Sequence, residues 1–115
     1  MKPIITYPDF EKLELRVGKI LEASNPDWST KLIEFKVDFG PEIGEKTIFS
    51  GIRKWYKSED LIGKLYPFLI NLAEKKMGES LSQGMMLMAD EEIDGQENPI
   101  LIEIPDKVKP GTVIR

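Results

Sequence analysis

The chain has 115 residues, 41% of them hydrophobic, which is enough to build one domain with its own core. Sixteen basic and twenty acidic residues give a net charge of −4, and neither cysteine nor histidine occurs. These absences exclude disulfides, thiolate or imidazole metal sites, and every catalytic arrangement that needs a histidine or cysteine. We expect a single domain over residues 1–115, no cofactor and no enzymatic activity.

The start of the chain, Met1–Pro8, is too short for a signal peptide, and no apolar run approaches the length of a membrane span. The lack of cysteine also favours a reducing compartment. We therefore expect a cytoplasmic protein.

The first elements are a helical turn and a long strand. Asp9–Lys12 predicts one turn with Asp9 as its N-cap. Residues 13–23 then alternate with period two, which predicts a strand. Gly18 in this strand predicts a bulge that would turn Lys19 outward. The expected apolar face holds Leu13, Leu15, Val17, Leu21 and Ala23.

Strands and one short helix make up the rest. Residues 32–39 alternate strictly and lead through a hairpin turn, Gly40–Lys46, into a strand over Thr47–Ile52. Ser58–Gly63 predicts a short helix that Ser58 caps and Gly63 ends. Further strands are expected at 65–72 and 85–89, with a late hairpin that pairs Ile100–Ile104 with the chain end. The order predicts an all-β, five-stranded OB-fold barrel with a short helix between strands 3 and 4 and extra C-terminal strands.

A polar loop joins the strand at 65–72 to the one at 85–89. It carries an amide, two cations and a hydroxyl–amide pair, at Asn71, Lys75, Lys76, Ser82 and Gln83. Such groups hold phosphate and sugar oxygens and reach base edges, whereas two adjacent lysines alone are more typical of a solvated connection.

Charge is unevenly distributed along the chain. Residues 46–76 hold seven basic and three acidic residues, whereas residues 77–106 hold eight acidic residues and no basic one. One face is therefore expected to attract a polyanion while another repels it. The overall acidity predicts weaker and more salt-sensitive binding than a basic domain would show.

Trp28 stands in the loop 25–31. An exposed tryptophan here offers a stacking surface for a nucleobase. The alternative is that its ring lies against the barrel or across a dimer seam.

The chain resembles the tRNA-binding domain appended to some methionyl- and tyrosyl-tRNA synthetases. Four segments carry the resemblance, in this order: Asp9–Ile20, Asn25–Leu32, Thr47–Ile52 and Lys75–Met85. That domain also occurs as free-standing tRNA-binding dimers and in CsaA-type chaperones. The resemblance implies an OB-fold barrel that binds tRNA and pairs with itself, and it places Lys19 and Met85 at the binding surface. The full set of residues that we expect to bind tRNA is Lys19, Lys31, Ser50, Arg53, Asn71, Lys75, Lys76, Ser82, Gln83 and Met85, with base stacking on Trp28.

The chain departs from the family pattern at Trp28, at Met77–Ser80, where many members read Met-Arg-Gly-Val, and at Ala73-Glu74, where Lys-Pro is commoner. Two of these departures cost a positive charge. We therefore expect weaker tRNA binding than in members that keep these charges.

The favoured function is a structure-specific tRNA-binding protein that acts alone or in trans with an aminoacyl-tRNA synthetase, like a methionyl-tRNA synthetase β-subunit. The alternative is a CsaA-like peptide-binding secretion chaperone, which the low charge and the methionines Met77, Met85, Met86 and Met88 suit better. The terminal apolar segments Ile4–Tyr7, Ile100–Ile104 and Val113-Ile114 predict a symmetric homodimer.

Overall fold

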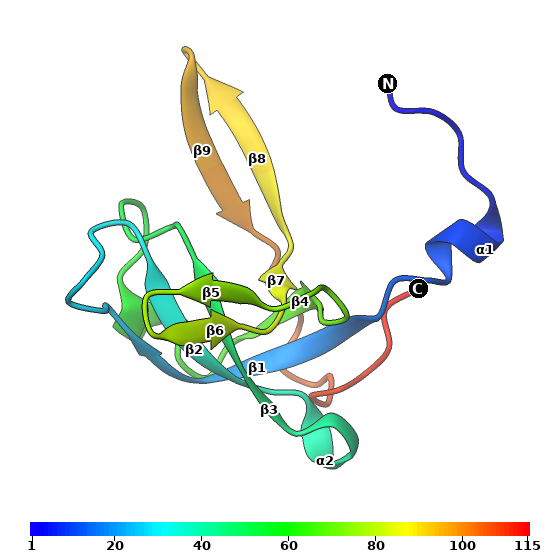
Figure 1. The fold of residues 1–115 in the computed structure, drawn as a ribbon, viewed down its shortest axis with the longest axis horizontal. Helices are drawn as coiled ribbons and strands as arrows, with labels where there is room; N and C mark the ends of the chain where they lie inside the picture. The colour runs from blue at the N-terminus through cyan, green and yellow to red at the C-terminus, as the bar shows by residue number, and fades with distance from the viewer.

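A single antiparallel sheet of five strands, in the order β3-β2-β1-β4-β7, curls into a nearly closed barrel (Figure 1). The computed structural model describes all 115 residues. It confirms the expected all-β barrel, with the short helix η1 between β3 and β4. The elements of the barrel are β1 (Leu15–Ser24), β2 (Ile33–Asp38), β3 (Glu45–Ser50), η1 (Ser58–Leu61), β4 (Leu65–Leu69) and β7 (Met85–Met86).

The alternation in β2 builds much of the core. Ile33, Phe35 and Val37 are completely buried while the residues between them are partly exposed, as the sequence predicts. β2 pairs antiparallel with β3, and the short helix α2 (Gly40–Ile43) occupies the connection where a simple turn was expected.

Gly18 faces the core instead of marking a bulge. A Cβ added there would lie 2.5 Å from Val37 Cγ1 and 2.7 Å from Phe39 Cε1, so only glycine fits. The register of β1 against β2 shifts between Ile20 and Glu22, three residues after the predicted bulge. Lys19 is exposed as expected, but through ordinary alternation.

The prediction of which β1 residues form the apolar face is therefore partly wrong. Ile20 is buried, whereas Leu21 remains 37% exposed. Val17 is buried as well, and its backbone N–H donates to the Thr112 carbonyl of the C-terminal segment at 2.9 Å.

Both predicted helix caps are wrong. Thr6 caps α1 (Tyr7–Phe10), and its backbone N–H donates to Asp9 Oδ2 at 3.2 Å. This bond and a further one from the Thr6 hydroxyl stabilise the carboxylate, so the pKa of Asp9 is lowered. In η1 the Ser58 hydroxyl donates to Glu59 at 3.4 Å instead of capping, while Gly63, at φ +85°, follows the helix end as predicted.

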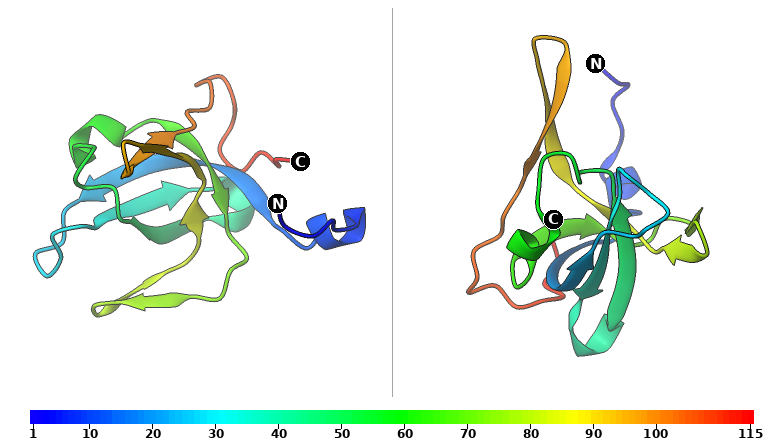
Figure 2. Two further views of the ribbon diagram at one scale, coloured as in Figure 1. Left: turned by 90° about the horizontal axis from the view of Figure 1, so that it is seen from above. Right: turned by 90° about the vertical axis from the view of Figure 1, so that its left-hand side faces the viewer.

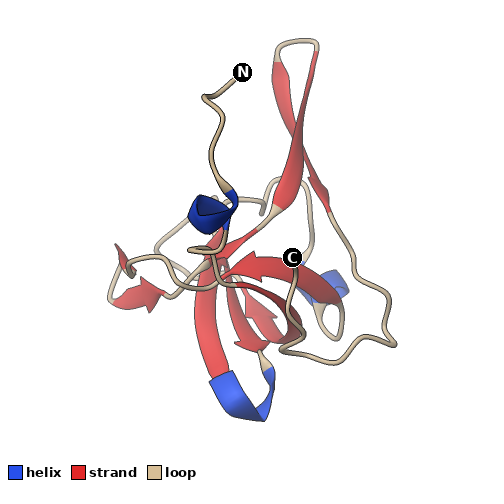
Figure 3. Ribbon diagram, turned by 90° about the vertical axis from the view of Figure 1, so that its right-hand side faces the viewer, coloured by secondary structure: helices blue, strands red, loops and turns tan.

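A two-stranded hairpin of β8 (Met88–Ile93) and β9 (Gln96–Leu101) projects from the barrel (Figures 1 and 3). We call residues 88–101 the acidic arm. β9 pairs with β8, so the expected pairing of Ile100–Ile104 with the chain end is wrong. The chain end instead runs beside β1, through a bridge between Arg16 and Val113.

A second small hairpin, of β5 (Lys75–Met77) and β6 (Ser80–Ser82), stands between β4 and β7 along the chain and lies beside the barrel (Figure 2). None of the helices is long and apolar enough to cross a membrane.

Candidate nucleic-acid interface

Gln83 and Ser82 join the β5–β6 hairpin to the edge of the barrel. Gln83 Oε1 accepts from the Thr47 N–H at 2.8 Å, and the Gln83 N–H donates to the Thr47 carbonyl at 2.8 Å. Ser82 Oγ accepts from the Phe49 N–H at 3.1 Å and is buried. These groups satisfy backbone donors of β3, so both side chains already have structural partners.

Asn71 makes a separate set of hydrogen bonds. Its Oδ1 accepts from the Glu14 N–H at 2.8 Å, and its Nδ2 donates to the Lys12 carbonyl at 2.7 Å. The side chain therefore ties the start of β1 to the end of β4, and it makes no hydrogen bond to Ser82 or Gln83.

Lys75 and Lys76 are both exposed on β5, where Lys75 pairs with Ser82 and Lys76 with Leu81. Because successive strand residues point to opposite faces, the two ammonium groups do not converge. Lys75 lines a cleft of about 360 Å³ between the β5–β6 hairpin and the barrel, which we call the hairpin cleft. Its other lining residues are mainly apolar and include Phe49, Leu72, Met77 and Met85.

Trp28 combines the two placements considered for it. Its ring packs on Phe49 with centroids 5.8 Å apart, yet the residue is 52% exposed. Gly78, at the tip of the β5–β6 hairpin with φ +60°, lies directly beneath the indole, and an added Cβ would be 2.8 Å from Trp28 Cε2. The loop 25–31 is thereby packed against the hairpin.

Arg53 holds the same loop from its other side. Its guanidinium donates to the Ser29 carbonyl and, at 3.5 Å, to that of Pro26, while its N–H donates to the Lys31 carbonyl at 3.2 Å. Arg53 therefore shapes the loop from which Lys31 extends into solvent. Ser50 stands opposite Ile33 at the end of β3.

The sequence interpretation missed Lys54 and Trp55. With Lys31 and Glu97 they line a second cleft, of about 470 Å³, which we call the Trp55 cleft. Lys54 Nζ lies 5.5 Å from the Trp55 ring centroid, within cation–π range. A lysine next to a tryptophan inside the basic stretch 46–76 was the available signal.

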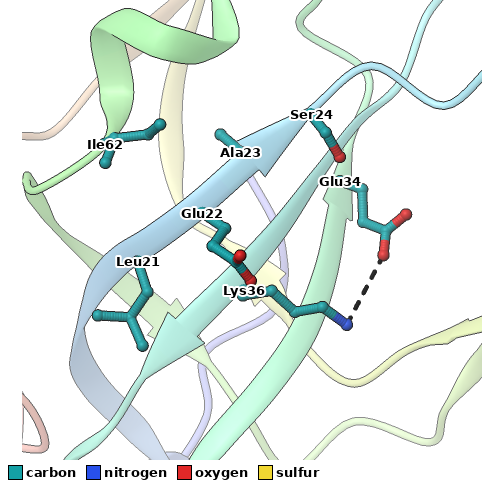
Figure 4. Close-up of a pocket in the computed structure, with 7 residues that line it drawn as sticks. All are labelled: Leu21, Glu22, Ala23, Ser24, Glu34, Lys36 and Ile62. Atoms are coloured by element: carbon teal, nitrogen blue, oxygen red, sulfur yellow. Dashed lines mark ion pairs between the residues drawn. The ribbon is translucent and has the colours of Figure 1, made fainter.

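A third cleft lies on the outer face of β1 and β2, lined by Leu21, Glu22, Glu34 and Lys36 among others (Figure 4). Its one cation, Lys36, pairs with Glu34 at 3.7 Å. Two carboxylates against one paired lysine make this surface unfavourable for a polyanion. Lys19 is exposed on β1, opposite Leu65 and Asp38.

A family model described as a putative tRNA binding domain matches residues 15–113. Methionine–tRNA ligase of Chromobacterium violaceum is 45% identical over 108 residues, which cover 93% of this chain and 15% of that enzyme. The enzyme of Clostridium acetobutylicum is 39% identical over 115 residues, covering 100% of this chain and 17% of the enzyme. The chain thus spans about a sixth of the length of these relatives.

Solved structures of similar size agree with these sequence relationships. The MetRS related protein of Pyrococcus horikoshii superposes with a TM-score of 0.88 at 34% identity, covering 99% of this chain and 100% of that one. The chaperone CsaA of Bacillus anthracis superposes with a TM-score of 0.83 at 27% identity, covering 98% of this chain and 100% of that one. This chain belongs to the family of tRNA-binding domains that is related to part of the methionyl-tRNA synthetases.

Proposed function

We propose that this protein recognises the shape of tRNA and binds it either alone or in trans with an aminoacyl-tRNA synthetase. We propose that this binding takes place in the cytoplasm. The observation that carries the proposal is the family match over residues 15–113 on a barrel that places Lys75 at an apolar cleft. The role is binding rather than catalysis, because the site offers cations, amides and rings and no histidine or cysteine.

Phosphates and bases would find different partners on this surface. Lys75 and Lys31 are exposed and engaged in none of the four ion pairs, so each can contact a phosphate oxygen. The exposed ring of Trp28 offers a stacking surface for an unpaired base. The exposed carboxylates of Asp90, Glu91, Glu92 and Asp94 on the acidic arm repel the RNA backbone, so the charge pattern favours one orientation of the RNA.

Filter binding with total tRNA tests the proposal. We expect saturable binding at physiological salt. The binding should weaken as salt rises, because the lysine and arginine side chains that contact phosphates release counterions from the RNA. Binding that is absent at protein concentrations of tens of micromolar would contradict it.

A peptide-binding, chaperone-like role is the second candidate. The hairpin cleft favours it, since its lining is mainly apolar and includes Met77 and Met85, whose flexible side chains adapt to varied apolar ligands. An unfolded peptide that displaces tRNA, with Met85→Ala reducing peptide affinity more than tRNA affinity, would support this role.

We also propose that the chain forms a symmetric homodimer. Ile4 and Ile5 are 91% and 62% exposed, and the projecting arm leaves Ile93 and Ile100 exposed. A two-stranded hairpin alone is marginally stable in water, so the arm gains from a partner. Sedimentation equilibrium should then show twice the mass of the 13.1 kDa chain, whereas 13.1 kDa at tens of micromolar protein would exclude the dimer.

A further inference from the structure

The Trp55 cleft lies where three segments of the chain meet. The loop 25–31 contributes Lys31, the segment after β3 contributes Lys54 and Trp55, and the acidic arm contributes Glu97. Figure 2 shows these three segments gathered at one end of the barrel. The cleft is separate from the hairpin cleft and shares no lining residue with it.

Hydrogen bonds hold all three segments in place. Arg53 donates through its side chain to the Pro26 and Ser29 carbonyls and through its N–H to the Lys31 carbonyl. The Tyr56 hydroxyl donates to the Pro99 carbonyl at 2.8 Å, which fixes the base of the arm. The cleft is therefore formed before any ligand arrives, and binding need not pay for ordering it.

The cleft holds two cations that have no anionic partner. The four ion pairs of the molecule involve Lys12, Arg16, Lys36 and Lys64, so Lys31 and Lys54 are both unpaired. Lys31 and Lys54 are exposed, so their ammonium groups can reach an incoming phosphate.

The other two groups suit a nucleobase. Trp55 packs partly against the core and remains partly exposed, so the exposed part of its indole can contact a base. Glu97 supplies a carboxylate, which accepts hydrogen bonds and therefore favours a base with an exocyclic amino group, such as the N4 amino group of cytosine. Uracil has a carbonyl oxygen at that position, and the carboxylate would repel it.

We propose that the Trp55 cleft binds one unpaired nucleotide and selects bases that carry an exocyclic amino group. Lys31 and Lys54 hold its phosphate, Trp55 stacks on its base, and Glu97 accepts from its amino group. The inference rests on the proposed RNA-binding function, to which it adds a second contact and a base preference. The cleft sets two cations and one acceptor carboxylate beside an aromatic ring. This combination favours a nucleotide over an apolar peptide side chain.

Tryptophan fluorescence tests this inference. Trp28→Phe leaves Trp55 as the single tryptophan, and short oligocytidylate and oligouridylate serve as matched probes. We expect oligocytidylate to quench Trp55 and to bind about tenfold more tightly than oligouridylate. Glu97→Gln should bring the two affinities close together, whereas Lys54→Ala should weaken both about equally.

Lys107→Ala removes an equal charge in the C-terminal segment and serves as the control, with both affinities expected to stay within twofold. Unchanged Trp55 fluorescence with either probe, while the protein that retains Trp28 binds total tRNA, would overturn the inference and leave the proposed function standing. Equal affinities for oligocytidylate and oligouridylate in the protein that retains Glu97 would overturn the base preference. Quenching by an unfolded peptide but by neither oligonucleotide would assign the cleft to peptides.

Discussion

Gln83 binds Thr47 through both its side chain and its main chain, with Oε1 accepting from the Thr47 N–H and the Gln83 N–H donating to the Thr47 carbonyl, each at 2.8 Å. The two bonds close the gap between β3 and the segment that leads into β7, the last strand of the barrel. A residue expected to contact RNA thus also seals an open sheet edge. Its Nε2 donates to Glu74 at 3.1 Å, so the whole amide is engaged.

Replacing Gln83 should therefore affect stability. Gln83→Ala leaves the partly buried Thr47 N–H without its acceptor, and we expect a loss of about 1–3 kcal/mol in the free energy of unfolding. Urea denaturation measures it. Glu74→Ala removes only the bond from Gln83 Nε2, keeps the Oε1 acceptor for Thr47, and should lose less. An unchanged urea midpoint in Gln83→Ala would show that the bond does not support the barrel.

Lys75 and Lys76 should contribute unequally to tRNA binding. Lys75 lines the hairpin cleft, and Lys76 points to the opposite face of β5. Lys75→Ala should weaken tRNA binding by about 1 kcal/mol and lower the salt slope of log K by about 1, as the loss of one phosphate contact does. Lys76→Ala, the matched control, should change both less. Equal effects of the two substitutions, measured by filter binding over a salt series, would argue against the hairpin cleft.

Trp28 and Gly78 should be coupled. Gly78→Ala places a Cβ against the indole and a side chain at φ +60°, so we expect a loss of about 1–2 kcal/mol or more in stability. In a Trp28→Ala background the steric part disappears and only the backbone part remains. A double-mutant cycle in urea measures the difference. Additive effects of the two substitutions would mean that the indole does not rest on Gly78 in solution.

Tyr66 should make the protein sensitive to alkali. Burial, with a smaller contribution from Glu103, raises the pKa of Tyr66 to about 12, whereas an unfolded tyrosine ionises near 10. The unfolded chain therefore releases this proton first, so Tyr66 leaves stability intact below pH 10 and lowers it as pH rises from 10 to 12. Urea denaturation over that range should show a shallower decline in Tyr66→Phe. The exposed Tyr7→Phe should decline as the parent does, and identical slopes in all three would contradict the shift.

Patterns local in sequence predicted much of the barrel. The alternation in β2 needed only period-two spacing, and its residues are buried as expected. Gly18 was misread because its reason is not local: Val37, Phe39 and Phe68 come from other strands and fill the space of a Cβ. The pairing of β9 with β8 was missed because an apolar run such as Ile100–Ile104 does not reveal its partner strand.

The candidate site also has features that the sequence could predict and features that it could not. The exposed lysines could be expected from polarity and position alone. The bonds of Asn71 to residues 12 and 14, and of Ser82 and Gln83 to β3, join segments far apart in the chain, so no spacing in the sequence indicated them. The Trp55 cleft needs three separate segments to meet, and only the adjacency of Lys54 and Trp55 hinted at it.

The proposed tRNA-binding function is tested most directly by comparing total tRNA with an unfolded peptide as ligands of the same protein, by equilibrium filter binding and peptide competition at physiological salt. We expect tRNA to bind at micromolar or lower concentration, and its binding to weaken as salt rises and to weaken further in Lys75→Ala. We expect the peptide to bind more weakly than tRNA. Tight peptide binding with no measurable tRNA binding would contradict it.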